Sequence, residues 1–361
     1  MKFFENGAAR PLFENGAARP LFENGAARPP VPPRAGTRRP ISLLFLVGVL
    51  AGCSSSNPNP GGPTTSASVA YTAIGASDAV GYGSSVPCAN PPLIAVPTCP
   101  GGTGYVPDLR NLLIEAGDTV TLNDLGISGA VIGPDILATS NKYGALGSAD
   151  ACQPRSSSDA YPADFIDAEL PQLTGKETLI TIFAGGNDTN GIANAAACMS
   201  AAGASTLQLD AFVVAEIAAF GNDFQKLVSA VHAKSPSARI VIANLPNFAL
   251  IPVGLQQTTA GQQLLAALST GFDLDVIDKA AALGYPVVDL LCNPQSYVST
   301  NFYTDGFHPD DAGYADFARV FYAQITAATP AQPSTTCSYA SAQAHLTSRP
   351  DRPFSDFSRP H

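Results

Sequence analysis

From residue 69 onward, two kinds of apolar pattern alternate along the chain. Short continuous runs rich in Val, Ile and Leu, such as TLITIFAGG (178–186), are typical of buried parallel strands. Longer stretches with apolar residues three and four positions apart, such as 206–235, are typical of amphipathic helices. The pattern predicts strands at 69–76, 119–126, 178–186, 239–246 and 285–291, and helices at 106–117, 206–235, 258–284 and 310–328.

Strands that alternate with helices indicate βαβ units, which build a parallel sheet with helices on both faces. We therefore expect an α/β fold whose whole core lies in one domain, residues 69–337. Two segments interrupt the alternation, a proline-rich stretch at 84–104 and the segment from about 131 to 175. Residues 338–361 have no apolar periodicity, and we expect a disordered tail there.

The residues before this pattern have the character of processing segments. Residues 1–33 contain three near-copies of the nine-residue unit FENGAARPL, which is too short for a solenoid repeat. We interpret them as disordered, or as translated DNA upstream of the true start. Residues 34–52 resemble a signal peptide, because a basic stretch precedes an apolar run at 41–52. That run is shorter than the roughly 20 residues that a membrane-spanning helix needs.

The apolar run ends in LAGC (50–53), which resembles the bacterial lipobox. In that motif the cysteine, here Cys53, is lipidated and becomes the first mature residue. The alternative is an ordinary secretory signal followed by an incidental cysteine. The polar residues 53–68 are expected to form a flexible tether. Ser54 resembles the second residue of lipoproteins that are sent to the outer membrane.

Composition and charge narrow the classes of partner. The chain has 361 residues, 45% of them hydrophobic, which is enough to build a large core. Its formal net charge of −10 argues against a nucleic-acid partner, which would need a basic face. We expect an exported monomer of the bacterial cell envelope, whose main membrane contact is the lipid on Cys53.

Six cysteines remain after Cys53, and an exported protein meets an oxidising compartment. They show no CxxC spacing, so we expect disulfides and no metal site. Six cysteines allow 15 pairings. Proximity in the sequence favours three of the possible pairs: Cys88 with Cys99, Cys152 with Cys198, and Cys292 with Cys337.

Small and polar residues follow the predicted strands. Ser77 follows the first strand, Gly129 in GISGA the second, Asn187 in GGND the third, and Asp305 and His308 in TDGFHPDD the fifth. In an open α/β sheet, sites collect beyond the carboxyl ends of the strands, so these residues should face one crevice. Each also has a simpler explanation. Ser77 could cap a helix, and Gly129 and Asn187 could belong to tight turns.

Because the sequence contains few histidines, the residues that follow the strands can be interpreted together as one catalytic site. A serine nucleophile needs a general base, most often histidine. His232 lies in a predicted helix, and His345 and His361 lie in the predicted tail, so only His308 lies in a strand-end loop. Asp305, three residues earlier, is close enough to orient its imidazole. The alternative is that Asp305 caps the final helix.

The blocks GASDA, NDLGISGA, GGND and DGFHP, in this order, resemble the motifs of the SGNH hydrolases, also called the GDSL esterase/lipase family. The resemblance covers nearly all of residues 69–330. It implies a flavodoxin-like, three-layer α/β/α sandwich with a five-stranded parallel sheet. It also implies a triad of Ser77, His308 and Asp305, and an oxyanion hole formed by Ser77, Gly129 and Asn187. It implies no metal or other cofactor.

The nucleophile block departs from the family pattern at one position. The family usually has Asp immediately before the serine, where this chain has Ala76, and an acid follows instead, Asp78. The usual Asp is not the triad acid, so Ser77 stays the candidate nucleophile. The support of its loop is expected to differ from that of other members.

The resemblance predicts a lipid-anchored serine esterase that hydrolyses carboxylic O-acyl esters. Glycan, short-chain, lipid and thioester acyl donors all remain open, and the acidic composition slightly favours small or carbohydrate esters. One alternative is a catalytically degenerate envelope lipoprotein that binds glycan on the same scaffold. Another is an envelope protein whose disulfide loops serve assembly.

Overall fold

The computed structural model describes residues 67–90, 94–95, 98–99, 101–143, 152–155 and 160–340. The predicted repeats (1–33), the predicted signal peptide (34–52) and Cys53 lie outside the described residues. The predicted tether (53–68) also lies outside them, apart from its last two positions. The boundaries proposed for these segments therefore stay predictions.

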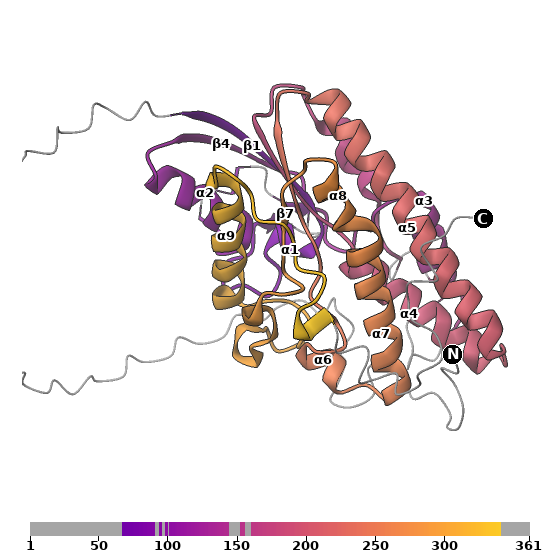
Figure 1. Cartoon of the computed structure of the whole chain (residues 1–361). Coiled ribbons are helices and arrows are strands. Elements are labelled where there is room, and N and C mark those ends of the chain that lie inside the picture. Colours follow the sequence, from indigo (N-terminus) through magenta and orange to yellow (C-terminus); the bar gives the residue numbers. More distant parts are fainter. Residues whose placement is uncertain are drawn as a thin grey trace, which may run out of the picture. The chain divides into compact units, whose positions relative to one another are not determined.

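Five parallel strands form the central sheet (Figure 1). The strand order is β4-β1-β5-β6-β7, which is the doubly wound, flavodoxin-like order with the second strand outside the first. The predicted α/β fold with a five-stranded parallel sheet is confirmed. The strands are β1 (Ser68–Gly75), β4 (Thr119–Asp124), β5 (Leu179–Phe183), β6 (Arg239–Ala243) and β7 (Val287–Val288).

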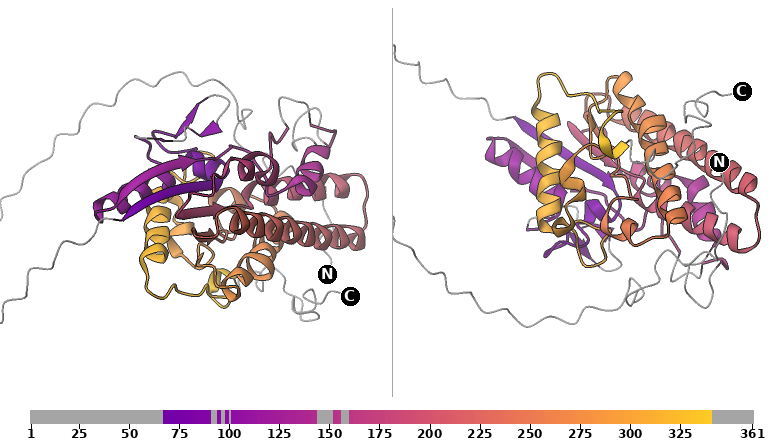
Figure 2. Two further views of the ribbon diagram at one scale, coloured as in Figure 1. Left: turned by 90° about the horizontal axis from the view of Figure 1, so that it is seen from above. Right: turned by 60° about the horizontal axis from the view of Figure 1, so that its bottom comes forward.

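Helices cover both faces of this sheet, which gives three layers (Figures 1 and 2). On one face α2 (Tyr105–Glu115) packs against α9 (Asp311–Thr326). The helices of the other face also pack on one another. They are α3 (Pro134–Lys142), α4 (Gly186–Ala201), α5 (Thr206–Lys234) and α7 (Thr259–Phe272). Among the described residues, no helix is both long and apolar enough to cross a membrane.

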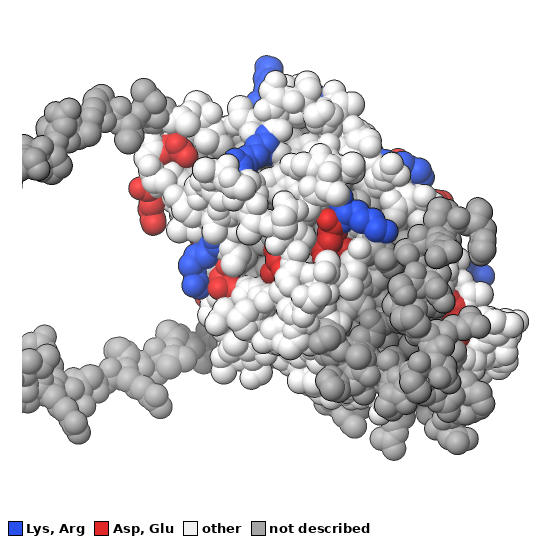
Figure 3. Space-filling view, viewed as in Figure 1, with Lys and Arg blue, Asp and Glu red and all other residues white. Residues whose placement is uncertain are grey.

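Charged side chains are sparse on the surface, as the 13% of charged residues in the sequence leads one to expect. On the face shown in Figure 3, acidic and basic side chains of the described residues are scattered among uncharged ones. The larger part of this face is uncharged. Folding of this chain therefore depends chiefly on apolar burial rather than on surface ion pairs.

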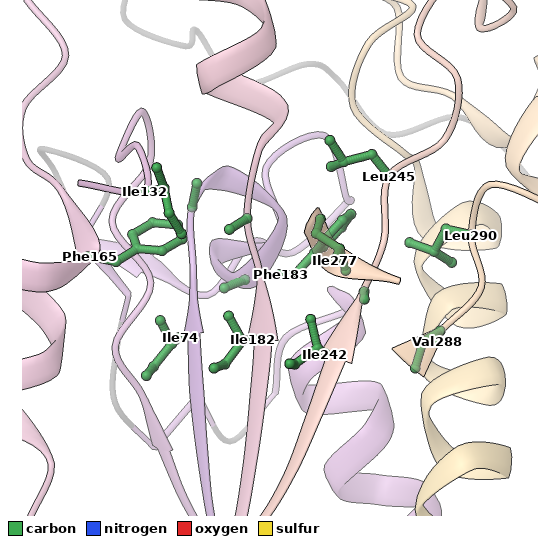
Figure 4. Close-up of a cluster of buried hydrophobic side chains, with 14 of the residues drawn as sticks. Ile74, Ile132, Phe165, Ile182, Phe183, Ile242, Leu245, Ile277, Val288 and Leu290 are labelled. Atoms are coloured by element: carbon green, nitrogen blue, oxygen red, sulfur yellow. The ribbon is translucent and has the colours of Figure 1, made fainter. Parts of the chain in front are cut away.

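The core lies where neighbouring strands present their β-branched residues side by side. Ile74, Ile182 and Ile242 are aligned by the register of β1, β5 and β6, and none of the three is more than 1% exposed (Figure 4). Burying a side chain of this size stabilises the fold by about 1.5–3 kcal/mol. Ile132 and Phe165 close the core beyond the ends of the strands (Figure 4).

The two segments that interrupt the alternation fold as additions beside the sheet. In the first, β2 (Ala89–Asn90) pairs antiparallel with β3 (Ile94–Ala95). The second contains α3, a π-helix (Phe165–Glu169) and a 3₁₀ turn (Leu170–Gln172). The short helices elsewhere are α1 (Ser77–Val80), α6 (Pro252–Leu255), α8 (Lys279–Ala282) and the 3₁₀ turns Pro294–Tyr297 and Ser299–Asn301.

Three disulfides join the pairs that sequence proximity favours: Cys88–Cys99, Cys152–Cys198 and Cys292–Cys337. The first closes the β2–β3 addition, and the second fastens the 131–175 segment to α4. Each bridge thus connects a peripheral segment to itself or to the main fold.

The expected helix at 258–284 is interrupted. It divides into α7, a π-helix at Asp273–Ile277 and α8. Where the π-helix begins, the buried side chain of Asp273 accepts a hydrogen bond from the backbone N–H of Leu245 at 2.8 Å. This contact draws the chain towards the end of β6. The last strand is also shorter than expected, since β7 covers only Val287–Val288.

The packed chain continues beyond residue 337, where we expected a disordered tail to begin. Residues 338–340 form a helical turn. The Tyr339 ring stacks on Tyr297 at a centroid distance of 4.1 Å, and the Tyr339 carbonyl accepts a 3.1 Å hydrogen bond from Nδ2 of Asn247. These contacts hold Tyr339 against the main fold, and residues 341–361 lie outside the described part.

Candidate active site

Ser77 lies where β1 ends and α1 begins. The turn is tight, because a Cβ added to Gly75 would lie 2.9 Å from the Cβ of Ala79. Ala76 is the N-cap of α1 and its side chain makes no capping hydrogen bond, so Ser77 is not the helix cap. The serine is 4% exposed and its hydroxyl is turned towards His308.

Glu169 supports this turn from the π-helix of the 131–175 segment. Its Oε2 accepts a hydrogen bond from the backbone N–H of Gly75 at 3.0 Å, and the side chain is fully buried. Burial raises the pKa of Glu169 well above its usual value, despite the hydrogen bond from Gly75. A carboxyl from a distant segment therefore steadies the loop in a chain that has Ala76 where the family usually has Asp.

Asp305 and His308 form one compact loop before α9. Oδ1 of Asp305 accepts hydrogen bonds from the backbone N–H groups of Phe307 (2.9 Å) and His308 (3.0 Å). Gly306 has φ +68°, a conformation that suits glycine. Asp310, not Asp305, caps α9, since its Oδ1 accepts from Ala312 and Gly313. Asp305 therefore does not cap the final helix, which was the alternative to its orienting role.

The loop brings His308 into contact with both predicted partners. Nδ1 of His308 lies 2.7 Å from Oδ2 of Asp305, and Nε2 lies 2.9 Å from Oγ of Ser77. The serine is 231 positions away in the sequence. Such a chain of contacts allows the imidazole to take the hydroxyl proton on one side while a carboxylate faces the other side.

Tyr82 covers the imidazole, a contact that no pattern in the sequence predicts. Its ring lies against His308 with 4.6 Å between centroids. Its backbone N–H donates to the carbonyl of Ser77 at 2.9 Å, so one turn carries both the candidate nucleophile and this cover. The His308 residue is 8% exposed as a result of this packing.

The electrostatics of Asp305 suit a carboxylate that stays ionised. Burial alone would raise its pKa, but hydrogen bonds from the His308 ring and from two backbone N–H groups outweigh burial. The pKa of Asp305 is therefore below its usual value. A negative charge is held beside Nδ1, where it favours the tautomer with the proton on that nitrogen and stabilises an imidazolium.

Gly129 lies on a loop and Asn187 lies at the start of α4, and hydrogen bonds hold these two segments together. Gly129 has φ +84° in the loop after β4. Asn187 is in the first turn of α4, and its Nδ2 donates to the carbonyl of Ala130 at 2.8 Å. An amide nitrogen carries two protons, so this bond fixes the side chain and leaves one N–H free to donate.

Asp188 accepts a further hydrogen bond that connects α4 to the loop after β4. Its Oδ1 accepts from the backbone N–H of Ile132 at 2.9 Å, and its side chain is fully buried. Burial raises the pKa of Asp188 to about 7. The GGND block is therefore the start of α4. The side chains of Asn187 and Asp188 both hold the loop that contains Gly129.

The remaining predicted residues lie apart from this site or outside the described part. His232 is exposed in the last turn of α5, beside Tyr285. His345, His361 and Cys53 lie outside the described residues. No group of three or more His, Cys, Asp or Glu side chains that could hold a metal ion occurs among the residues the structure describes.

A small pocket lies next to the two loops that carry Ser77 and His308. Its lining includes Asp78, which follows Ser77, Gly186, which precedes Asn187, and both neighbours of His308. We name it the phenylalanine pocket after its five aromatic side chains: Phe183, Phe248, Phe302, Phe307 and Phe317. Phe248 and Phe307, which stack with 5.3 Å between their ring centroids, line this pocket and also a second apolar pocket.

Comparison with known proteins adds a family match. The model of the GDSL-like lipase/acylhydrolase family matches residues 73–315, a range that contains Ser77, Gly129, Asn187, Asp305 and His308. No curated protein sequence matches the chain.

Solved structures with a similar fold come from several bacteria. The extracellular lipase of Streptomyces rimosus is 16% identical, with a TM-score of 0.47 over 70% of this chain and 98% of that one. Phospholipase A1 of Streptomyces albidoflavus is 19% identical, with a TM-score of 0.45 over 71% and 98%. The aryl esterase of M. smegmatis is 14% identical, with a TM-score of 0.39 over 71% and 98%.

Proposed function

The chain belongs to the GDSL-like lipase/acylhydrolase family, and on that premise we propose that it is a serine esterase that hydrolyses carboxylic O-acyl esters. The observation that carries the proposal is the line of contacts from Ser77 through His308 to Asp305, at 2.9 and 2.7 Å. In this proposal Ser77 is the nucleophile, His308 the general base and Asp305 the orienting acid.

The first half of the reaction acylates the enzyme. Nε2 of His308 takes the hydroxyl proton of Ser77 while Oγ forms a bond to the ester carbonyl carbon. The carbonyl π electrons move to the oxygen, which becomes a tetrahedral oxyanion. When that intermediate collapses, the bond to the alcohol oxygen breaks and His308 returns its proton to the leaving alcohol.

The second half of the reaction releases the acid. His308 takes a proton from water, whose oxygen attacks the acyl-enzyme carbonyl, and Ser77 leaves with the proton from His308. Asp305 stays ionised throughout and stabilises the imidazolium in both halves, in keeping with its lowered pKa.

Three donors are proposed for the oxyanion: the backbone N–H groups of Ser77 and Gly129 and the side-chain amide of Asn187. The bond from Asn187 to Ala130 supports this role, because it fixes the amide before substrate arrives. Donors that need no reorganisation stabilise the transition state more than the ground state, and removing one typically costs about 10²–10³ in kcat.

Ester hydrolysis by a Ser77 variant tests the proposal. We expect Ser77→Ala to lower kcat on 4-nitrophenyl acetate by on the order of 10⁴-fold or more, with an unchanged far-UV spectrum and unfolding midpoint. Ser237→Ala, at an exposed turn between α5 and β6, is the matched control and should keep wild-type turnover. Turnover by Ser77→Ala within a few fold of wild type would refute the proposed nucleophile.

We also propose that the mature protein is anchored in the bacterial outer membrane by a lipid on Cys53. The LAGC sequence and the polar residues after it support this proposal. Cells expressing the full chain and fed an alkyne fatty acid should label the wild type but not Cys53→Ala. Equal labelling of both proteins would mean that the fatty acid is attached elsewhere, and no labelling of either would favour an ordinary secretory signal; both results would refute an anchor at Cys53.

A further inference from the structure

The phenylalanine pocket contains one ionisable side chain, and that side chain is next to the nucleophile. Asp78 is the only Asp, Glu, Lys, Arg or His in its described lining, where all other members are aromatic, aliphatic, proline or glycine. Such a lining is well suited to an apolar group of a substrate. A carboxyl among phenylalanines needs a separate explanation, because a charge in an apolar site costs free energy unless it is paired.

Among the described residues, the only hydrogen bond to the carboxyl of Asp78 comes from its own backbone N–H. No other described residue donates a hydrogen bond to it, and no described Lys or Arg lines the pocket. The titratable groups that influence it are His308 and Asp305 from the loop before α9, Tyr105 of α2 and Tyr314 of α9. Burial raises the pKa of Asp78, and His308 opposes that effect only in part.

Aromatic faces and a carboxylate attract the same kind of ligand. The negative face of a phenyl ring attracts a cation, and substituted ammonium groups are bound in this way because they are both apolar and charged. A carboxylate in the same pocket supplies the balancing negative charge. An unsubstituted alkyl or acyl group would fill the phenylalanine pocket equally well but would leave Asp78 unpaired.

We propose that the phenylalanine pocket binds a substituted or quaternary ammonium group of the ester, with Asp78 as the residue that selects for its charge. The inference rests on the proposed esterase function and names its substrate class: an ester with an apolar cation on its acyl or its alcohol half. The pocket touches both the oxyanion side, through Gly186, and the His308 side, through Phe307. The test therefore includes esters with the cation on the acyl half and esters with the cation on the alcohol half.

Two pairs of esters that differ only in charge measure the selectivity. Butyrylcholine is compared with 3,3-dimethylbutyl butyrate, which has a carbon in place of the nitrogen of the alcohol. The 4-nitrophenyl ester of 4-(trimethylammonio)butyric acid is compared with that of 5,5-dimethylhexanoic acid, the equivalent change in the acid. Within a pair, the ratio of kcat/KM cancels any change in the triad that acts on both esters alike.

We expect wild-type enzyme to favour the charged ester in at least one pair, and Asp78→Asn to lower that ratio by about tenfold. The ratio should also rise with pH in the wild type, as the Asp78 carboxyl ionises, and should be flat in Asp78→Asn. Asp135→Asn removes the same charge from an exposed position on α3 and should leave the ratio at its wild-type value.

Failure of this inference differs from failure of the proposed function. If neutral esters are hydrolysed but neither pair favours the cation, or Asp78→Asn leaves the ratio unchanged, the pocket selects apolar groups only and Asp78 acts on both substrates through His308. If none of the four esters is hydrolysed, the esterase proposal itself is wrong.

A measurement on the wild type keeps the test decisive if Asp78→Asn does not fold. Tetraethylammonium should then inhibit hydrolysis of the neutral ester competitively, and more strongly at higher pH. Absence of inhibition at concentrations that leave the fold intact would overturn the ammonium site.

Discussion

Asp305 uses both oxygens of its carboxylate to fix His308. One oxygen accepts two backbone N–H groups and closes the loop, and the other accepts from the ring at 2.7 Å. The sequence was sufficient to predict this pair because the two residues are three positions apart and few histidines compete. It could not predict Tyr82 or Glu169, whose contacts with the site arise only when distant segments pack.

Asp305→Asn separates the charge of this residue from its shape. The amide oxygen can still accept from the backbone of the loop, but the charge beside Nδ1 is lost and the wrong tautomer is favoured. We expect kcat on a 4-nitrophenyl ester to fall by about 10⁴-fold, with little change in the unfolding midpoint. Asp310→Asn, which keeps a good N-cap on α9, should retain wild-type kcat. A loss in Asp305→Asn of less than tenfold would contradict the role of the carboxylate.

A substitution at Gly129 tests the proposed oxyanion hole. Its φ of +84° is unfavourable for other residues, and a Cβ there would lie 3.0 Å from Cδ of Pro162. We expect Gly129→Ala to displace the N–H that we propose as an oxyanion donor, and to lower kcat by about 10²–10³-fold. Gly117→Ala has the same kind of strain, with φ +102° and open space around it, far from the site. This control should lose stability but not kcat, and equal kcat losses in both would speak against an oxyanion role for Gly129.

Helix α4 is the longest described element that the sequence pattern did not predict. Its composition is mainly Ala, Gly and Asn, which gives no apolar stripe at helical spacing. The structure explains its stability, because small residues let α4 pack closely against α3, α5 and α7, and nine of its residues are buried. The consequence for the site is large, since the first turn of α4 carries Asn187 and Asp188.

Gly191 marks the closest approach of α4 to α3. A Cβ at this position would lie 2.7 Å from Cβ of Ser140 and 3.4 Å from its Cα. We expect Gly191→Ala to lower the free energy of unfolding in urea by about 1–3 kcal/mol, because overpacking outweighs the better helix propensity of Ala. Adding Ser140→Gly should restore most of the loss. If Gly191→Ala alone is as stable as wild type, the helices do not pack as closely as described.

The helix at 258–284 shows the opposite case, in which a predicted element is interrupted where it makes a tertiary contact. The apolar periodicity continues through the segment, but the regular ladder changes to the π pattern at Asp273, where the buried side chain accepts a hydrogen bond from the backbone N–H of Leu245. Local pattern therefore located the helix correctly, whereas its interruption coincides with a contact to a residue 28 positions away.

On the scale of the whole chain, the alternation of apolar runs was enough to predict the α/β class, and the positions after the strands were enough to predict the contacts of His308 with Ser77 and Asp305. The reason is geometric: parallel strands end at one edge of the sheet, so residues far apart in sequence gather there. Buried contacts could not be predicted in the same way. Asp188 and Asp273 are buried carboxyls whose partners are backbone N–H groups of distant segments.

Buried carboxyls give the protein a distinctive stability profile. Burial raises the pKa of Asp124 to about 8 and those of Asp188 and Asp278 to about 7. The unfolded chain releases these protons near pH 3.9. Between about pH 4 and 7 the folded state thus holds protons that the unfolded state has lost, so the free energy of unfolding should fall as pH rises.

Asp124→Asn tests this profile. The amide keeps an acceptor for the N–H of Gly126 but cannot ionise, so the fall in unfolding free energy between pH 5 and 8 should be shallower than in wild type. Asp135→Asn, exposed on α3, should follow the wild-type profile. Urea denaturation at several pH values gives the slopes, and equal slopes in Asp124→Asn and wild type would contradict the assignment.

The central claim is that one serine, activated by His308, carries out the chemistry. Reaction of the protein with a fluorophosphonate probe, followed by mass-spectrometric mapping of the labelled peptide, tests it most directly. The account predicts one labelled residue, Ser77, and no label in His308→Ala. Label on a different serine, or equal labelling of Ser77 after denaturation and in the native state, would contradict it.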